Sequence, residues 1–240
     1  MKLIKIATPV FVLLFLVSCG NKSQKAINNT RNDEIEKAKQ DSIEKAKEKE
    51  RIAWLDSMAV FAWGDAKFGI KEKELSKTKA FSDKNYNQIL RESLGLKEGI
   101  FHFDFNGKNR GLCSLKISCV HDIDNLDDLI SDINVLYNQI KEKYGEPTGV
   151  KNSPYSLRKT DIIGSAWIDI AYWNIGSEDN EYGTKHINLS IHKYVGSLYE
   201  AFASIHNPRY SKDYKPKTEE DKKREKEHQK AVDEAKEYAF

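Results

Sequence analysis

The sequence predicts an α+β fold: a single antiparallel sheet of four or five strands with one main amphipathic helix (125–144) packed on it, flanked by charged N-terminal and C-terminal helices. Three observations support this prediction. Residues 101–119 alternate apolar and polar side chains on both sides of a turn. Residues 125–144 repeat apolar side chains at helical spacing. Charged residues, 32% of the chain, concentrate at its two ends. Paired strands around one helix indicate a sheet with a covered face.

A targeting segment is predicted at the start of the chain, in residues 1–18. Lys2 and Lys5 make its beginning basic, and residues 6–17 are almost wholly apolar. This length suits a secretory signal peptide and is well short of the roughly 20 residues that a membrane-spanning helix needs. We therefore expect an exported precursor from which the segment is cleaved.

The residues at the expected cleavage point, Leu16-Val17-Ser18-Cys19, resemble the bacterial lipobox. In lipobox proteins the cysteine receives a diacylglyceryl group and becomes the new N-terminus, and two or more acyl chains give stable anchoring. The resemblance implies lipidation of Cys19 and attachment to a membrane of the bacterial envelope, with the outer membrane favoured and the protein facing the periplasm or the cell surface. The alternative is an ordinary signal peptide cut near Ser18.

The charge balance argues against nucleic acid as a partner. The whole chain has 39 basic and 37 acidic residues, and residues 1–18 contain two of the lysines and none of the acids. The mature chain is therefore formally neutral, whereas nucleic-acid-binding proteins usually carry a basic excess. No cofactor is predicted.

Two segments precede the globular domain. Residues 19–31 are polar and predict a flexible leader close to the lipid. Residues 32–62 predict a charged helical stalk, in which the pentapeptide 35–39 recurs unchanged at 43–47. Opposite charges three and four residues apart support a solvated helix. A coiled coil is the alternative, but the eight-residue repeat and the sparse apolar residues fit it less well.

Residues 207–240 predict a charged C-terminal helical tail. Thr218-Glu219-Glu220-Asp221 starts the helix in the manner of a capping box. The segment is polar all round until residues 231–240, so it is either a solvated helix or a docking segment whose last turns bind a partner or fold back.

The predicted globular domain covers residues 63–206. Strands are predicted at 101–105, 113–119, 166–170 and 187–191, each with alternating apolar side chains. Residues 85–94 fit a helix or a strand, and the neighbouring strands favour a strand.

The main helix, 125–144, has one apolar face, formed by Leu126, Leu129, Ile130, Ile133, Leu136, Tyr137, Ile140 and Tyr144. Asp124 or Asn125 is expected to cap its N-terminus, and Gly145 and Pro147 to end it.

The two cysteines of the domain are expected to be buried free thiols. Cys113 and Cys119 lie six residues apart in one predicted strand, which separates them by roughly 20 Å at 3.3 Å per residue. A disulfide needs Cα atoms within about 7 Å.

Two tryptophans suggest a contact surface. Trp167 and Trp173 have the opposite strand parity from Ile168 and Ile170, so both are expected on the face away from the core. Exposed aromatic side chains often mark sites that bind proteins. The alternatives are a strand buried on both faces or a helix covering the tryptophans.

An envelope enzyme of the hydrolase type is the alternative function. The sequence contains none of the Gly-x-Ser-x-Gly, P-loop, Gly-x-Gly-x-x-Gly or His-Glu-x-x-His motifs. His102, Asp104 and His186 fall on the polar side of their predicted strands and could line a cleft there. Their spacing is not diagnostic, so ordinary surface histidines are the favoured interpretation, and no metal ligand or catalytic residue is predicted.

Two tripeptides, Asp41-Ser42-Ile43 and Asp56-Ser57-Met58, resemble an O-glycosylation sequon used by some bacteria on exported lipoproteins. The resemblance implies glycans on Ser42 and Ser57, near the stalk.

The globular part resembles a loose class of uncharacterised bacterial lipoproteins. Four pieces carry the resemblance: Phe68-Gly69-Ile70, the aromatic hairpin from Phe101 to Val120, Tyr144-Gly145-Glu146-Pro147, and the closing strands from Ile162 to Tyr194. The arrangement is similar to small modules of outer-membrane assembly lipoproteins and of β-lactamase-inhibitor-like proteins. Such modules bind other proteins and are not enzymes. The resemblance therefore implies a binding or scaffolding module with a protein partner in the envelope.

Overall fold

A computed structural model describes residues 23–82, 86–96, 99–216 and 218–237. The chain divides into two compact units, residues 1–49 and 50–240. The helix α1 (Ser23–Met58) begins within the predicted leader and continues past residue 49 into the second unit, and its side chains from Glu36 to Trp54 are exposed. Ser and Asn have low helix propensity, which is why the predicted start lay at residue 32. No helix among the described residues is both long and apolar enough to cross a membrane.

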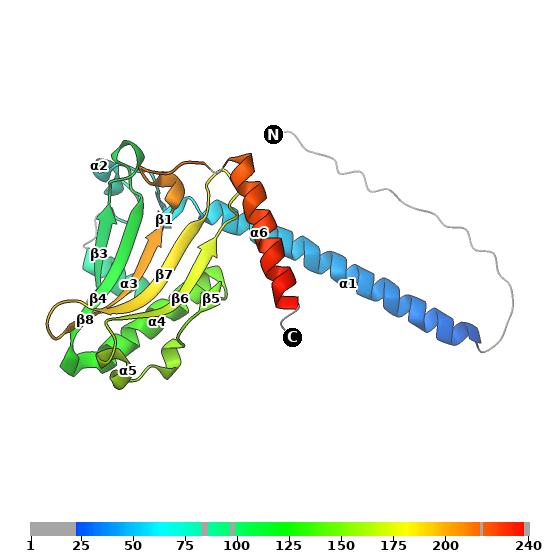
Figure 1. The fold of residues 1–240 in the computed structure, drawn as a ribbon, viewed down its shortest axis with the longest axis horizontal. Coiled ribbons are helices and arrows are strands. Elements are labelled where there is room, and N and C mark those ends of the chain that lie inside the picture. Colours follow the sequence, from blue (N-terminus) through cyan, green and yellow to red (C-terminus); the bar gives the residue numbers. More distant parts are fainter. Residues whose placement is uncertain (1–22, 83–85, 97–98, 217, 238–240) are drawn as a thin grey trace. The chain divides into compact units, whose positions relative to one another are not determined.

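The second unit is built on a six-stranded antiparallel sheet, one strand more than the largest predicted number (Figure 1). The order across the sheet is β3-β4-β8-β7-β6-β5. The strands are β3 (Gly99–Asp104), β4 (Ser114–Asp122), β5 (Gly149–Val150), β6 (Trp167–Ile175), β7 (Lys185–Lys193) and β8 (Leu198–His206).

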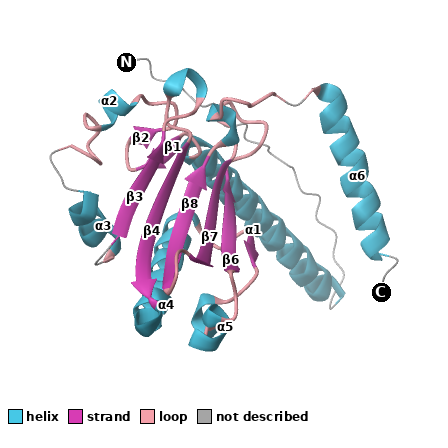
Figure 2. Ribbon diagram, turned by 60° about the vertical axis from the view of Figure 1, so that its left-hand side comes forward, coloured by secondary structure: helices cyan, strands magenta, loops and turns pink. Residues whose placement is uncertain are grey.

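The helix α4 (Leu126–Tyr144) connects the two halves of the sheet and lies across one face (Figure 2). It leads from β4 to the far edge strand β5, and the chain then returns through β6 and β7 to β8, which pairs with β4. We call the face under α4 the inner face and the opposite one the outer face. The predicted main helix is confirmed.

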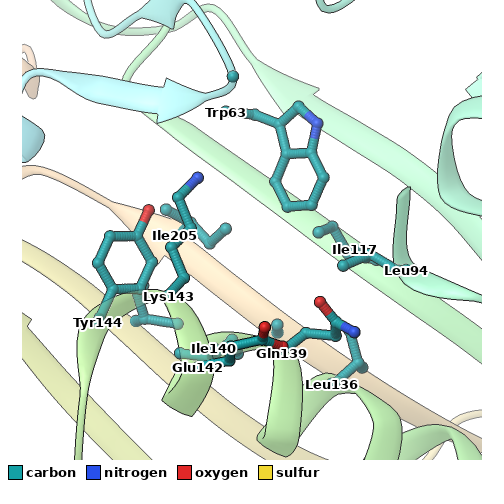
Figure 3. A pocket seen from close by; sticks show the side chains of 13 residues that line it. Trp63, Leu94, Ile117, Leu136, Gln139, Ile140, Glu142, Lys143, Tyr144 and Ile205 are labelled. Carbon is teal, nitrogen blue, oxygen red and sulfur yellow. The ribbon is translucent and has the colours of Figure 1, made fainter.

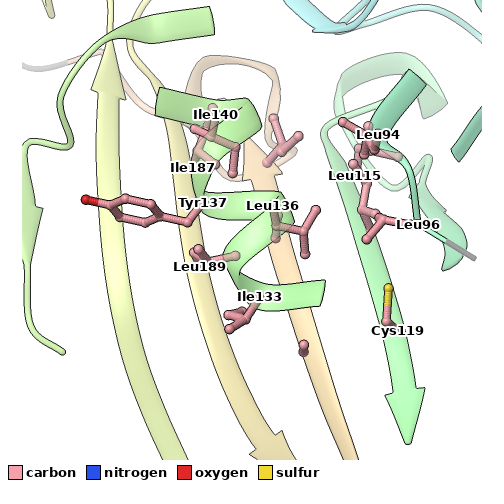
Figure 4. Close-up of a cluster of buried hydrophobic side chains, with 14 of the residues drawn as sticks. Leu94, Leu96, Leu115, Cys119, Ile133, Leu136, Tyr137, Ile140, Ile187 and Leu189 are labelled. Atoms are coloured by element: carbon pink, nitrogen blue, oxygen red, sulfur yellow. The ribbon is translucent and has the colours of Figure 1, made fainter. Parts of the chain in front are cut away.

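The helical spacing of the apolar residues explains why this segment forms α4. The six fully covered side chains recur at helical spacing: Leu126, Leu129, Ile133, Leu136, Tyr137 and Ile140. They pack on aliphatic residues of the inner face, among them Leu115, Ile187 and Leu189 (Figure 4). Gly145 ends the helix with φ +87°, where other residues are strained, and its N–H donates to the Lys141 carbonyl. Asn125 occupies the N-cap without a capping side-chain bond.

A β-bulge in β6 changes which side chains face the core. Asp169 pairs with Ser190 and Ala171 pairs with Leu189, so Ile170 is an extra residue on its strand. Ile168 and Ile170 are buried before the bulge, and Ala171 and Trp173 are buried after it. The parity therefore reverses within the strand. The prediction that both tryptophans share one face is wrong.

The segment 85–94 contains a helix, so the preference for a strand is wrong. In α3 (Tyr86–Leu94), Ile89, Leu90 and Leu94 are buried. Their spacing of one, four and five residues is helical. The aromatic residues of β3, Phe101 and Phe103, pack against Tyr86 and complete this side of the core.

The central strand β8 has no counterpart among the predicted strands. It has neighbours on both sides and contributes buried residues to both faces. Ala201 and Ala203 lie on its inner face, and alanine has a low strand propensity. Glu200 and Phe202 are buried on the outer face, and the apolar Phe202 interrupts the apolar–polar alternation that identifies half-buried strands.

Two short strands, two short helices and the C-terminal helix α6 complete the list of elements. They are β1 (Phe61–Trp63), β2 (Ala66–Lys67), α2 (Glu72–Leu75), α5 (Lys159–Ile163) and α6 (Glu219–Glu237), with short 3-10 turns at 108–110, 123–125, 154–156 and 208–210. The predicted capping box of α6 is present, because the Asp221 carboxylate accepts from the Thr218 N–H at 3.0 Å and the Thr218 hydroxyl accepts from the Asp221 N–H at 3.2 Å.

A buried lysine joins the end of α1 to the sheet. Lys185, the first residue of β7, is fully buried. Its Nζ donates to the carbonyls of Met58 and Phe61 at 2.9 and 3.1 Å and to the Tyr144 hydroxyl at 3.0 Å. The Met58 carbonyl belongs to the last turn of α1, where carbonyls lack helical partners. Burial is the main cause that lowers the pKa of Lys185 to about 7, and the charge of the neighbouring Lys143 contributes to this shift.

Both cysteines of the domain are free thiols, as predicted. Cys119 is buried on the inner face of β4. Cys113 precedes β4 and is only partly buried, and its Sγ donates to the Asp104 carbonyl at 3.4 Å. Burial raises the pKa of the Cys113 thiol, which favours the unreactive protonated form.

Candidate binding face of the sheet

The outer face of the sheet gathers a row of aromatic, charged and polar side chains from strands that are distant in the sequence. Trp167 of β6 lies opposite His192 of β7, which lies opposite Glu200 of β8. Two residues further along these strands, on the same face, Ser190 lies opposite Phe202, and Phe202 lies opposite Ser118 of β4. The register of the sheet thus creates this cluster.

Three rings form the centre of the cluster. The Trp167 indole stacks on the His192 imidazole with centroids 5.3 Å apart and planes 11° from parallel. Phe202 meets the edges of both rings at 5.4 and 5.2 Å. Phe202 is 6% exposed, whereas Trp167 is 55% exposed and presents apolar surface to solvent. Tyr194 extends the patch beyond His192, with centroids 6.1 Å apart.

A buried carboxylate lies beside these rings. Glu200 is 2% exposed, and both its oxygens accept from the Lys116 Nζ, at 2.9 and 3.1 Å. His192 Nδ1 is 3.3 Å from the second oxygen. The Lys116 ammonium also lies 5.4 Å from the centroid of the Phe202 ring. A buried charge is tolerated where partners satisfy it, so this pair fixes the side chains around the rings.

A second carboxylate orients Trp167. The indole Nε1–H donates to Asp169 Oδ1 at 2.6 Å, and the Ser190 hydroxyl donates to the same oxygen at 3.1 Å. The indole bond is the main cause that holds the pKa of Asp169 below its usual range, with Lys151 acting in the same direction. The exposed indole is therefore held in one orientation, which reduces the entropy that binding would cost.

A polar hollow adjoins Trp167 at the end of the sheet. It has a volume of about 390 Å³, and its walls include Lys151, Asn152, Ser156, Asp161, Trp167 and Asp169. Charged and amide groups therefore surround the exposed ring, in the arrangement of an apolar centre with a polar rim that protein interfaces share.

Trp173 does not belong to this face. It is 1% exposed, its ring lies 5.7 Å from that of Tyr137, and its Nε1–H donates to the Gly145 carbonyl at 3.0 Å. It is a core residue that also fixes the end of α4. The prediction of a contact surface at Trp173 is wrong, because the bulge at Ile170 turns the second half of β6 over.

The fold does not bring together His102, Asp104 and His186, the residues suggested for an enzyme site. His102 of β3 and His186 of β7 are three strands apart, which is roughly 14 Å at 4.8 Å per strand. His102 Nε2 lies 3.0 Å from the Ser118 Oγ, and Asp104 accepts from the Asn106 N–H at 2.8 Å in a local turn. His186 stacks on His206 at 5.2 Å. Among the described residues, no group of three acidic, histidine or cysteine side chains could hold a metal ion.

Of the predicted modification sites, the structure describes the two serines but not the cysteine. Cys19 and the predicted signal peptide lie outside the described residues. Ser42 and Ser57 lie on α1 with exposed side chains. The Ser57 hydroxyl donates to the Trp54 carbonyl at 2.6 Å, and the neighbouring Asp56 accepts from the Ser177 N–H at 2.7 Å.

Sequence reasoning found only one member of the outer cluster, Trp167. Phe202 and Glu200 were missed because β8 was not predicted, and no site was predicted at Lys116 or His192. A usable signal did exist: the alternating run Glu200, Phe202, Ser204 and His206 follows a turn after β7.

The comparisons give no relative. No family model matches the chain, and no curated protein and no solved structure matches it significantly.

Proposed function

We propose that this chain is a lipid-anchored lipoprotein of the bacterial cell envelope, held through Cys19 to a membrane, with the outer membrane favoured. Its globular part acts as a protein-binding or scaffolding module, and the outer face around Trp167 is its contact surface. The half-exposed Trp167 ring, stacked on His192 above Phe202, is the observation that carries the proposal.

The chemistry of the cluster favours a folded protein as the partner. Tryptophan and tyrosine are enriched among the residues that dominate binding energies, and Trp167 and Tyr194 are both more than half exposed. The indole is fixed by Asp169, so the surface is largely formed before binding. Lys116 and Glu200 neutralise each other, which favours a partner of mixed charge over a polyanion.

Photo-cross-linking in living cells tests the proposal. A photoreactive residue at Asn188, an exposed position on the outer-face side of β7, is expected to capture a defined protein that mass spectrometry identifies. Trp167→Ala should reduce that product at least tenfold, because central aromatic side chains contribute roughly 2 kcal/mol or more.

Trp54→Ala is the matched control, since Trp54 is 43% exposed but lies at the end of α1 against Tyr144. This variant should retain the product. If the product survives Trp167→Ala, or is lost equally in both variants, the proposed surface is incorrect.

The anchor needs its own test. Cys19→Ser removes the acyl acceptor, so the protein should move from the membrane fraction to the soluble fraction of the envelope. A chain that remains in the membrane fraction would contradict anchoring through Cys19.

A further inference from the structure

An apolar pocket lies on the inner face, at the C-terminal end of α4, on the opposite side of the sheet from the proposed contact surface. It has a volume of about 510 Å³. Its apolar walls come from both the sheet and helices: Leu94, Ile117, Leu136, Ile140, Ile187, Ala203 and Ile205. Trp63 and Lys143 stand at one side of the pocket, and Gln139 lies on the helix below (Figure 3). Small-molecule sites commonly combine such apolar walls with a few polar groups.

The polar group that distinguishes this pocket is Lys143. Its Nζ lies 5.8 Å from the Trp63 ring centroid and 5.3 Å from that of Tyr144, and it forms no ion pair with a described residue. Desolvation lowers the pKa of Lys143, so its surroundings disfavour the charge. The Nζ of the buried Lys185 also lies near Tyr144, 4.4 Å from the centroid of its ring. Two lysine amino groups thus lie near one aromatic ring at the pocket.

We infer that this pocket binds a single-chain carboxylate amphiphile, a free fatty acid, with the alkyl chain against the aliphatic walls and the carboxylate at Lys143. Charge complementarity selects this ligand. An anionic head supplies a counter-charge for Lys143, whose side chain is exposed and whose Nζ lies near two aromatic rings, and a hydrogen bond between two charged groups is stronger than one between neutral groups. Glu142 is also in the wall and disfavours a head with more than one negative charge.

The volume sets the length of the chain. A ten-carbon acid has twelve heavy atoms and needs roughly 360 Å³ if each heavy atom takes about the volume of one liquid water, near 30 Å³. The volume of the pocket, about 510 Å³, therefore exceeds the volume that decanoate needs. Burial of the methylene groups is favourable, so the chain provides most of the affinity and the head provides selectivity.

Calorimetric titration of the full chain with decanoate and with decanol tests the inference, and the Cys19→Ser form serves as parent because it carries no lipid of its own. Decanoate should bind the parent saturably with a stoichiometry of one. Lys143→Gln should weaken decanoate roughly tenfold and leave decanol within about twofold, because only the acid uses the charge. Lys193→Gln, at the far end of β7, is the matched control and should bind both ligands as the parent does.

A second variant tests the location independently of charge. Ala203→Leu extends a side chain from the floor into the pocket, and should weaken both ligands while the far-ultraviolet circular dichroism spectrum stays that of the parent. Lack of saturable decanoate binding to the parent would overturn the inference. So would decanoate binding that Lys143→Gln leaves unchanged. Neither result bears on the outer-face cross-link, which is scored separately.

Discussion

The two faces of the sheet are built from different chemistry. Under α4, the inner face is almost wholly aliphatic, with Leu115, Ile117, Leu189 and Ile205 each 5% exposed or less. The outer face combines rings, hydroxyls and charges, and the side chain at its centre, Phe202, is covered by neighbouring side chains rather than by a helix. The inner face stabilises the fold, whereas the outer face offers a surface whose groups are already paired and oriented.

The comparison is sharpest between two tryptophans of one strand. Trp167 and Trp173 lie six residues apart on β6, and a single extra residue places them on opposite faces. One is 55% exposed and the other 1%. The same side chain therefore lies at the surface in one half of the strand and in the core in the other.

Trp173→Ala is expected to cause the largest loss of stability, about 3–5 kcal/mol, because it leaves a large cavity beside Tyr137 and removes the bond to the Gly145 carbonyl. Trp167→Ala should cost about 1 kcal/mol or less, since the ring is half exposed. Urea unfolding followed by circular dichroism measures both values. Equal losses in the two variants would contradict the assignment of the tryptophans to opposite faces.

The inner face was accessible from the sequence because a surface helix over one face leaves a periodic pattern. The apolar positions of α4 were predicted, and the six covered ones are in that set. The hairpin β3–β4 and the strands β6 and β7 were predicted for the same reason, since each alternates over most of its length.

The outer face was not accessible because its members come from four strands whose register no local pattern specifies. Lys116, Trp167, His192 and Phe202 meet only through the pairing of β4 with β8, β8 with β7 and β7 with β6. The bulge did leave a trace in the sequence: apolar residues shift from even positions, Ile168 and Ile170, to odd positions, Ala171, Trp173 and Ile175. A change of parity within one strand predicts a bulge.

The inner face has one exception to its aliphatic character, Lys185, and pH tests its state. The pKa of the buried ammonium, about 7, lies below its ordinary value of 10.5. Between these values the unfolded chain binds a proton that the folded chain does not, so raising the pH favours folding. Relative to Lys185→Met, the parent should gain up to about 1.4 kcal/mol per pH unit, or roughly 2–3 kcal/mol from pH 7 to pH 9.

Urea unfolding of the parent and of Lys185→Met at pH 6, 7, 8 and 9 gives this difference directly. Below pH 6 both states of the parent are protonated, and the difference should be constant. A difference that stays constant up to pH 9 would mean that the carbonyls of Met58 and Phe61 hold the proton in the folded chain.

The outer face should make the stability of the fold depend on pH in the acid range instead. This effect should be smaller than those of the tryptophan substitutions and of Lys185. Burial lowers the pKa values of His186 and His206 below the ordinary value of 6.5, and the charge of His186 lowers that of His206 further, while Glu178 acts in the opposite direction on His186. As the pH falls below 6.5, the unfolded chain takes up protons that the folded pair resists, so stability falls. Between pH 7 and pH 5 the parent should lose on the order of 1 kcal/mol more than His206→Phe, which keeps a ring against His186 but does not titrate; solvent screening limits the effect.

His228→Phe, at an exposed position on α6, is the control and should follow the parent. Thermal unfolding across this range would contradict the assignment if His206→Phe and His228→Phe lost stability equally, because the acid response would then arise outside the stacked pair.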